Sequence, residues 1–330
     1  MKFAIGSDPE FAFTNDKGDV IPAFKVLHSK TVLQDTIGLD ARISTAELRP
    51  IYSPSTYVHL NNIFRAKGQI SNICNQFGIN AVAAPIVGSE SLGGHIHIST
   101  DYSRNVNQDL VADAVVLQFL ALPAAKFLFG QRLYTRYKQS GFRYGSPYDV
   151  RADWGKNHIE LRMFPTFLGL NNQNIKAILD YYVDGFVYMQ HHDLSVPGLK
   201  KSSIRTAPVG FTETLNIDRE KFDKLVDKMY RYAYSEKLGF AMKFYRSLNK
   251  LNNDFVIARH GRVTTNILQY SGIVQYLSPR VRSRVQIIRG ADNIETRNGV
   301  TYVSLSEKIP NDQFISDSIR IGKKILEKVK

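Results

Sequence analysis

Four short segments of the sequence carry acids, histidines and arginines at every second position. These alternating residues are Asp8 and Glu10, Glu47 and Arg49, His95, His97 and Ser99, and His158, Glu160 and Arg162. Residues i and i+2 of a strand face the same side, so each segment predicts a strand with one polar and one apolar face. A single strand of this kind fits a solvated outer face. Four of them, none containing lysine, predict a composite binding site.

The residue types indicate which ligands such a site would take. Carboxylates suit Mg²⁺, which usually keeps several waters and lies beside substrate phosphates. Imidazoles in the same site favour Mg²⁺ or Mn²⁺ shared with a nucleotide over a closed zinc site. Arginines bind phosphate oxygens and neutralise charge during phosphoryl transfer. The sequence contains neither G-x-x-x-x-G-K-[ST] nor G-x-G-x-x-G, so it predicts an ATP site without a P-loop.

A further segment, from Gly141 to Arg151, places Arg143 and Arg151 around a Gly/Pro turn just ahead of the strand that carries Glu160. Loops beside a sheet often carry functional residues. We therefore predict that both arginines contact phosphates, and an ordinary surface loop is the alternative.

The elements that position these residues are predicted from hydrophobic periodicity. Alternation and turn residues predict a hairpin in the first fifty residues and strands over 81–87, 94–100 and 157–164. Helical spacing predicts helices over 55–78 and 107–130, the second largely buried. From 172 onward we predict helices over 172–191, 218–235 and 312–330 and a connecting loop over 193–215. This gives a catalytic core of 1–170 and a basic, mainly helical region of 171–330 that completes the domain or binds substrate.

The composition is that of a globular protein. Among 330 residues, 43% are hydrophobic and 22% are charged, which excludes a disordered or fibrous chain. The single cysteine, Cys74, forms no internal disulfide. The N-terminus reaches Asp8 too early for the apolar core of a signal peptide, and there is no run of 18 apolar residues. We expect a cytoplasmic protein without membrane insertion.

The net charge of +13 is concentrated in the second half of the chain. Residues 171–330 contain 26 Lys and Arg against 16 Asp and Glu, a balance of +10, and residues 1–170 contain 17 against 14, a balance of +3. We interpret the basic half as a surface for an anionic partner.

The motifs D-P-E-F at 8–11, E-L-R-P at 47–50, G-G-H-I-H-I at 93–98 and E-L-R at 160–162 occur, together with the Arg143–Arg151 loop, in an order that resembles the phage-type carboxylate–amine ligases. This amidoligase family is distantly related to glutamine synthetase and to glutamate–cysteine ligase. The resemblance covers residues 3–168. It implies an α+β fold, with a glutamine-synthetase-like antiparallel sheet whose concave catalytic face binds ATP and divalent ions. Helices would pack on the other face, and the mainly helical C-terminal part predicted from periodicity lies beyond the resemblance.

The resemblance also implies roles for individual residues. The implied metal ligands are Glu10, Glu47, His95 and Glu160. His97 and Ser99 would line the nucleotide, Arg143 and Arg151 would contact phosphates, and Arg162 would contact the γ-phosphate. Catalysis would then depend on Glu10, Glu160 and Arg162. Asp8 would contact one of the metal ligands and orient it without binding the metal itself. Where the family has an Asp-Gly turn before the second acid, this chain has Gly38-Leu39-Asp40-Ala41.

The predicted function is an ATP-dependent ligase that uses Mg²⁺, or Mn²⁺, to join a carboxylate to an amine through an acyl phosphate. Peptides and cell-wall fragments are among the candidate substrates, and a phage-encoded protein would act in the host cytoplasm. Two alternatives stay open. One is a kinase of the same fold that phosphorylates a carboxylate or guanidino group. The other is a basic nucleic-acid-binding or virion-associated protein with a relict ligase core.

Overall fold

The computed structural model describes residues 3–27, 36–40, 43–100, 108–139, 145–153, 158–205, 217–249, 255–260, 285–289, 293–297 and 300–305. The chain divides into two compact units. Unit 1 comprises Met1–Ala66 and Val82–Ile257, and unit 2 comprises Lys67–Ala81 and Ala258–Lys330. Residue 170, where the sequence analysis ended the first of its two regions, therefore lies inside unit 1. Arg143 and the helix expected over 312–330 lie outside the described residues.

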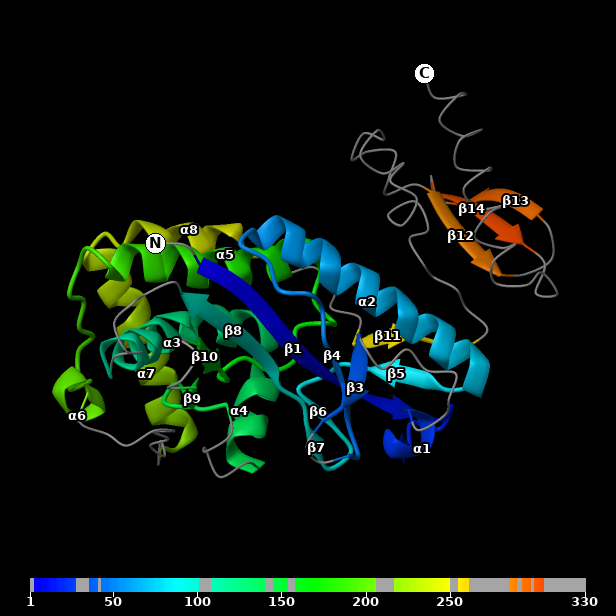
Figure 1. Ribbon diagram of the computed structural model, residues 1–330, viewed down its shortest axis with the longest axis horizontal. Coiled ribbons are helices and arrows are strands. Elements are labelled where there is room, and N and C mark those ends of the chain that lie inside the picture. The colour runs from blue at the N-terminus through cyan, green and yellow to red at the C-terminus, as the bar shows by residue number, and fades with distance from the viewer. Residues whose placement is uncertain are drawn as a thin grey trace, which may run out of the picture. The chain divides into compact units, whose positions relative to one another are not determined.

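Unit 1 is built on an antiparallel sheet. Its consecutive neighbours are β1 (Phe3–Thr14), β8 (Gly94–Thr100), β10 (His158–Leu161) and β9 (Val150–Asp153) (Figure 1). β1 also pairs with β2 (Val20–Ile21) and β4 (Ala46–Leu48), and β4 pairs with β3 (Ile37–Leu39). These pairs are all antiparallel, so the predicted α+β class with an antiparallel sheet is confirmed.

The hairpin between β1 and β2 is formed by local side-chain chemistry. The Asn15 side-chain oxygen accepts hydrogen bonds from the backbone N–H groups of Lys17 and Asp19, both at 2.9 Å. Gly18 adopts a φ of +87°, which glycine tolerates without a steric penalty. The turn returns the chain antiparallel to β1, as the sequence predicted.

The helices of unit 1 are α1 (Phe24–Leu27), the start of α2 (Thr56–Phe77), α3 (Gln108–Phe129), α4 (Gln131–Gln139), α5 (Asn172–Met189), α6 (Lys201–Arg205), α7 (Arg219–Ser235) and α8 (Gly239–Ser247). The helices predicted over 55–78, 107–130, 172–191 and 218–235 correspond to α2, α3, α5 and α7. The sequence analysis assigned no helix to the shorter α1, α4 and α8, and α6 lies within the segment 193–215 that was expected to be a loop. Asn171 and Asp218 cap α5 and α7 by accepting hydrogen bonds from backbone N–H groups in the first turn. α3 contacts β9 and β10, and α5 contacts β1.

Helix α3 is long and apolar enough to span a membrane by length and composition alone. However, 72% of its most apolar stretch is buried inside the protein. A core helix of a globular protein has the same properties, and the prediction that this helix is largely buried is confirmed.

The apolar face of the sheet forms part of the core. Phe11, Ile96, Ile98 and Ile159 are fully buried, and each alternates with a polar residue of the candidate site. Burial of one face fixes the strand register, because a slip of one residue would turn the apolar side chains outward. The same constraint collects the polar side chains on the opposite face.

Two predicted strands differ from those observed. The strand expected over 81–87 is divided into β5 (Asn80–Val82) and β6 (Ile86–Val87), with Pro85, which lacks a backbone N–H, just before β6. β6 pairs with β7 (Glu90–Ser91). The strand expected over 157–164 ends at Leu161, and β9 occupies a segment predicted to be loop, so Arg151 lies in a strand.

The expectation of a mainly helical second part does not hold for residues 285–305. Three strands form a sheet there, with β12 (Val285–Arg289) parallel to β14 (Val300–Leu305) and β13 (Asn293–Arg297) antiparallel to β14. β-Branched and aromatic residues such as Val300, Thr301, Tyr302 and Val303 favour strands. One further short strand, β11, spans Val256–Ala258.

Candidate functional site

The register of the sheet brings the four polar segments together. Asp8 of β1 lies opposite His95 of β8, and Glu160 of β10 lies opposite His97 on the other side of β8. Glu47 of β4 lies opposite Glu10 of β1. Residues from four separate parts of the sequence therefore share one region of the sheet.

The centre of this region is His95, surrounded by carboxylates. Its Nδ1 lies 3.2 Å from Asp8 Oδ1 and 3.2 Å from Glu160 Oε1, and its Nε2 lies 3.6 Å from Glu10 Oε1. We call Asp8, Glu10, His95 and Glu160 the acid–imidazole cluster. His95 and Glu10 are buried, and the second Glu10 oxygen accepts a hydrogen bond from Gly93 N at 2.7 Å.

The acid–imidazole cluster fits a hard divalent cation. Ligand atoms of Asp8, His95 and Glu160 lie within 4.8 Å of one another, and the carboxylate of Glu10 borders this group. Three carboxylates and one imidazole form a donor set that suits Mg²⁺ or Mn²⁺. The sequence assigned Asp8 only a supporting position, whereas the structure places it among the converging ligand atoms.

Asp8 also connects the cluster to a pair of stacked histidines. Burial raises the pKa of Asp8, but hydrogen bonds with His95 and His97 outweigh it and hold that pKa well below its usual range. His97 Nε2 lies 3.1 Å from Asp8 Oδ1, and His97 Nδ1 lies 2.9 Å from His158 Nε2. The two imidazole rings are stacked, with centroids 5.0 Å apart.

Glu47 borders the cluster instead of joining its centre. Its Oε1 accepts a hydrogen bond from Arg49 Nε at 2.8 Å. Burial raises the pKa of Glu47 to about 6, the Asp8 carboxylate adds to the shift and Arg49 opposes it. A carboxyl group with this pKa is partly protonated near neutral pH and would become a better cation ligand on losing its proton.

An open pocket of about 410 Å³ lies next to the cluster. Its lining residues are Ala4, Gly6, Ser7, Asp8, Glu47, Arg49, Pro50, Tyr52, His97, Ser99 and His158. His97 and Ser99, which the resemblance assigned to the nucleotide, therefore line a pocket that includes Asp8 and Glu47. Tyr52 was missed by the sequence analysis, although it follows the Glu47 segment by only a few residues.

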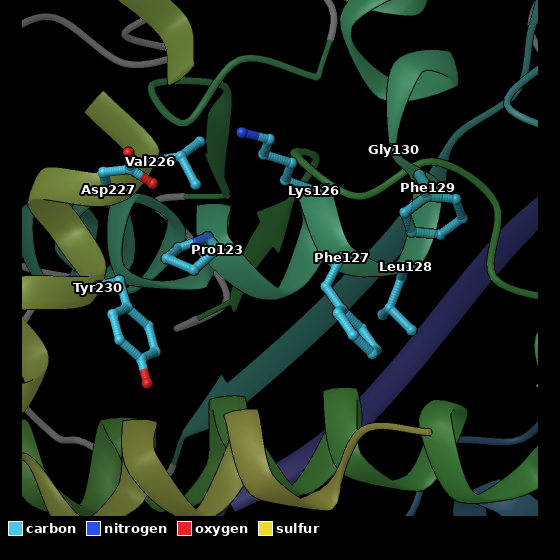
Figure 2. A pocket seen from close by; sticks show the side chains of 9 residues that line it. All are labelled: Pro123, Lys126, Phe127, Leu128, Phe129, Gly130, Val226, Asp227 and Tyr230. Atoms are coloured by element: carbon cyan, nitrogen blue, oxygen red, sulfur yellow. The ribbon is translucent and has the colours of Figure 1, made fainter. Parts of the chain in front are cut away.

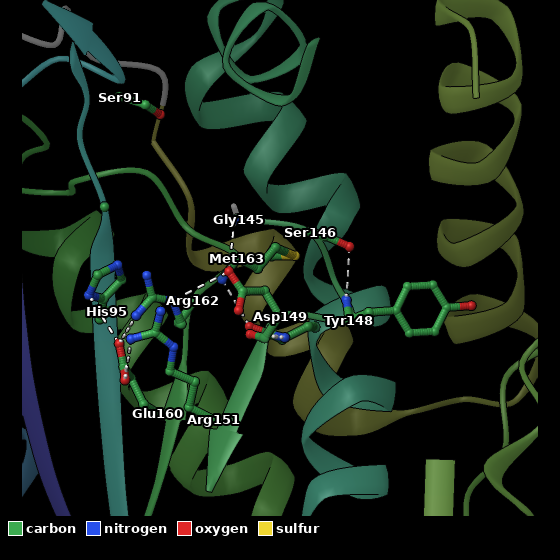
Figure 3. Close-up of polar contacts among 12 residues, drawn as sticks. Ser91, His95, Gly145, Ser146, Tyr148, Asp149, Arg151, Glu160, Arg162 and Met163 are labelled. Carbon is green, nitrogen blue, oxygen red and sulfur yellow. Dashed lines mark hydrogen bonds and ion pairs between the residues drawn. The ribbon is translucent and has the colours of Figure 1, made fainter. Parts of the chain in front are cut away.

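The arginines occupy different environments (Figure 3). Arg162 is buried, and its Nη1 lies 2.6 Å from Glu160 Oε1 while its Nε lies 3.3 Å from Asp149 Oδ2. Arg151 has a side chain that is 60% exposed, and its Nη1 lies 4.0 Å from Glu160 Oε2. The structure thus brings both arginines to Glu160 and holds only Arg162 firmly.

The residue that holds Arg162, Asp149, was not predicted. Its buried carboxylate also accepts a hydrogen bond from Gly145 N at 3.1 Å (Figure 3). Gly145 has a φ of +81°, and a Cβ at this position would lie 2.7 Å from Arg136 Nη1. An acid within a Gly/Pro turn, two residues before Arg151, was the only signal in the sequence.

A second pocket, of about 520 Å³, lies beside α3 and α7 (Figure 2). Its lining residues are Pro123, Lys126, Phe127, Leu128, Phe129, Gly130, Val226, Asp227 and Tyr230. None of the predicted site residues that the structure describes lines this pocket. It provides one lysine and one aspartate among mostly apolar side chains, so we place the chemistry at the acid–imidazole cluster.

No protein-family model matches the sequence, and no curated protein matches it. Solved structures that resemble the chain include GmaS without ligand, with a TM-score of 0.43 and 14% identity over 75% of this chain and 68% of that chain. A bifunctional glutathione synthetase from Pasteurella multocida has a TM-score of 0.41 and 10% identity over 74% and 46%. GmaS in its ADP complex has a TM-score of 0.38 and 12% identity over 76% and 71%. Because all three TM-scores are below 0.5, these likenesses say nothing about function. The function is therefore inferred from the site residues.

Proposed function

We propose that the protein is an ATP-dependent ligase that joins a carboxylate to an amine. The observation that carries this proposal is the convergence of Asp8, His95 and Glu160, with ligand atoms within 4.8 Å of one another, beside the buried guanidinium of Arg162. Acids that bind a divalent ion next to an arginine that binds phosphate form a combination suited to phosphoryl transfer from ATP.

In the proposed reaction, a carboxylate oxygen of the substrate attacks the γ-phosphorus of ATP. The bond to the bridging oxygen breaks, ADP leaves and an acyl phosphate forms. The amine nitrogen then attacks the acyl carbon, the carbon–oxygen bond to phosphate breaks, and the amide forms with loss of one proton and inorganic phosphate. Such chemistry depends mainly on positioning and electrostatic stabilisation.

The residues have separate tasks in this proposal. The acid–imidazole cluster, with Glu47 at its edge, would hold Mg²⁺ or Mn²⁺, which when bound supplies positive charge beside the phosphates. His97 and Ser99 line the nucleotide. Arg151 and Arg143 bind the phosphates of ATP before the phosphoryl group is transferred.

Arg162 has two interpretations, and its surroundings bear on both. As the ion-pair partner of Glu160 it would need only a positive charge. As a ligand of the transferring phosphoryl group it would need the planar guanidinium. Contacts with Glu160 at 2.6 Å and Asp149 at 3.3 Å hold the guanidinium in one orientation, and this preorganisation supports the second interpretation.

The test is to incubate the protein with ATP, Mg²⁺ and a metabolite pool, and to identify the products by mass spectrometry. An amide formed together with ADP and phosphate supports the proposal. A phosphorylated product without amide would instead indicate a kinase, and the absence of ATP turnover would refute both.

Three variants assign the activity to the site. Glu10→Gln, Glu47→Gln and Glu160→Gln should each lose metal-dependent ATP turnover by orders of magnitude while the fold is retained, because these carboxylates lie on the polar face. The matched control is Glu220→Gln, since Glu220 is 77% exposed on α7. Full turnover in all three site variants would contradict the assignment.

A further inference from the structure

Gln118 is a polar side chain in the middle of the most apolar helix of unit 1. It lies on α3 and is fully buried. Its neighbours along the helix, Val115, Val116, Leu117 and Leu122, are all apolar and buried. A buried amide is costly unless its hydrogen-bonding groups find partners, so the partners of Gln118 indicate what the residue does.

The Gln118 amide joins two segments of the site. Its Nε2 donates to Pro147 O at 2.8 Å and to Asp149 O at 3.2 Å. Its Oε1 accepts from Met163 N at 3.0 Å. Both hydrogens of the amide nitrogen and the amide oxygen are therefore used, and all three bonds go to backbone groups.

The two joined segments are those that hold Arg162. Asp149 contributes its carboxylate to Arg162 Nε at 3.3 Å and its backbone oxygen to Arg162 N at 3.2 Å. Met163 directly follows Arg162, and its backbone oxygen accepts from Arg136 Nη1 at 3.3 Å. Gln118 thus fixes two segments: the loop whose Asp149 contacts the Arg162 guanidinium, and the backbone at Met163, next to Arg162 itself.

We infer that Gln118 is a positioning residue that sets the orientation of the Arg162 guanidinium through Asp149 and Met163. The inference rests on the proposed function, in which Arg162 acts on the transferring phosphoryl group. Gln118 lies behind the site, on a helix that contacts β9 and β10, and its hydrogen bonds go to backbone groups of the protein.

The test compares Gln118→Met with Tyr181→Phe. Methionine keeps a similar volume and removes all three hydrogen bonds. The control removes a buried hydrogen bond to the neighbouring residue of the same helix, since Tyr181 donates to Leu117 O at 2.7 Å, and leaves the Asp149 loop unchanged. If Gln118→Met does not fold, Gln118→Glu takes its place, because a buried, protonated glutamate keeps the acceptor for Met163 N and can make only one of the two donations.

Three measurements separate positioning from a purely structural role. In Gln118→Met, ATP turnover at saturation should fall about 10- to 100-fold, as expected when a catalytic group is displaced. Affinity for Mg²⁺ with a non-hydrolysable ATP analogue should stay within about twofold, because ground-state binding is retained. The Arg162 Nε–H proton, assigned by its absence in Arg162→Lys, should exchange with water faster than in the parent in ¹⁵N-edited NMR spectra.

Tyr181→Phe should leave turnover per folded molecule and the Arg162 Nε–H exchange rate at parental values. The inference is overturned if Gln118→Met leaves the Nε–H exchange rate unchanged, or if its turnover falls no more than that of Tyr181→Phe. Failure of the proposed function looks different: the parent itself would show no ATP turnover. The exchange measurement would then still decide whether Gln118 positions Arg162.

Discussion

Replacing Asp149 by asparagine should lower the free energy of unfolding by about 1.5–3 kcal/mol, the range for hydrogen bonds that involve charged groups. The Asp149 side chain is 5% exposed, and it accepts from Arg162 Nε at 3.3 Å and from Gly145 N at 3.1 Å. Asparagine keeps one acceptor and loses the charge. Arg162 retains Glu160 at 2.6 Å, so the cost should stay below the ~3–5 kcal/mol expected when a buried charge loses its partner.

The assay is urea unfolding at pH 7, with Asp184→Asn as the control for the same chemical change. Asp184 Oδ2 lies 2.7 Å from Lys243 Nζ, a shorter contact than that of Asp149, but these side chains are 40% and 63% exposed. Water screens such a pair, and its loss should cost about 0–1 kcal/mol. We therefore expect Asp149→Asn to cost more stability than Asp184→Asn, because the Asp149 contact is buried, although the Asp184 contact is shorter.

Equal destabilisation by Asp149→Asn and Asp184→Asn would refute this reasoning. It would mean that water reaches Asp149 in solution and that Arg162 is not held as the structure shows. The preorganisation argument for Arg162 would then fail as well.

Three further predictions concern the loop, a buried histidine and the arginines. Gly145→Ala should destabilise more than Gly18→Ala in urea unfolding, because both glycines have positive φ values but only a Cβ at 145 would meet a buried guanidinium; equal costs would contradict the close approach. Burial lowers the pKa of His59 below 6.5, so the stability that neutral His59 contributes is complete above pH 6.5 and is lost as the pH falls through the lowered pKa. The difference in the free energy of unfolding between the parent and His59→Gln should therefore shrink from pH 7.5 to pH 5. A constant difference would mean that protonation of His59 does not contribute to the loss of stability at low pH. Arg162→Lys should bind ATP almost normally and lose turnover, whereas Arg151→Lys should mainly weaken ATP binding; steady-state kinetics distinguish the two, and unchanged turnover in Arg162→Lys would return that residue to a structural role.

The strands that carry the site could be predicted because alternation is a local property. The polar residues at 8 and 10, 95 and 97, and 158 and 160 each alternate with buried apolar residues, and burial of one face fixes the other. The extended segments and their polar faces are therefore readable from the sequence. The order of the strands across the sheet is not local, and the contact of Asp8 with His95 depends on it.

Other parts of the site have no periodicity to reveal them. Asp149 is a single acid in a turn, and its burial depends on packing that the sequence does not show. Gln118 had a usable signal, because a lone amide in an apolar helix must find hydrogen-bond partners, yet their identity requires the fold. The three strands within 285–305 are short segments with polar residues between the apolar ones. They fall in the second part of the chain, which we expected to be mainly helical, between the helices predicted over 218–235 and 312–330.

The central claim, that the acid–imidazole cluster holds the divalent ion used with ATP, is tested most directly by pulsed EPR of Mn²⁺. The parent, with a non-hydrolysable ATP analogue, should bind Mn²⁺ and show nitrogen couplings from a directly coordinated imidazole. His97→Ala should retain these couplings and His95→Ala should lose them, because the ring nitrogens of His95 lie 3.2–3.6 Å from oxygens of three carboxylates, whereas His97 has a close contact with Asp8. Absence of bound Mn²⁺ in the parent, or couplings that persist in His95→Ala, would contradict the account.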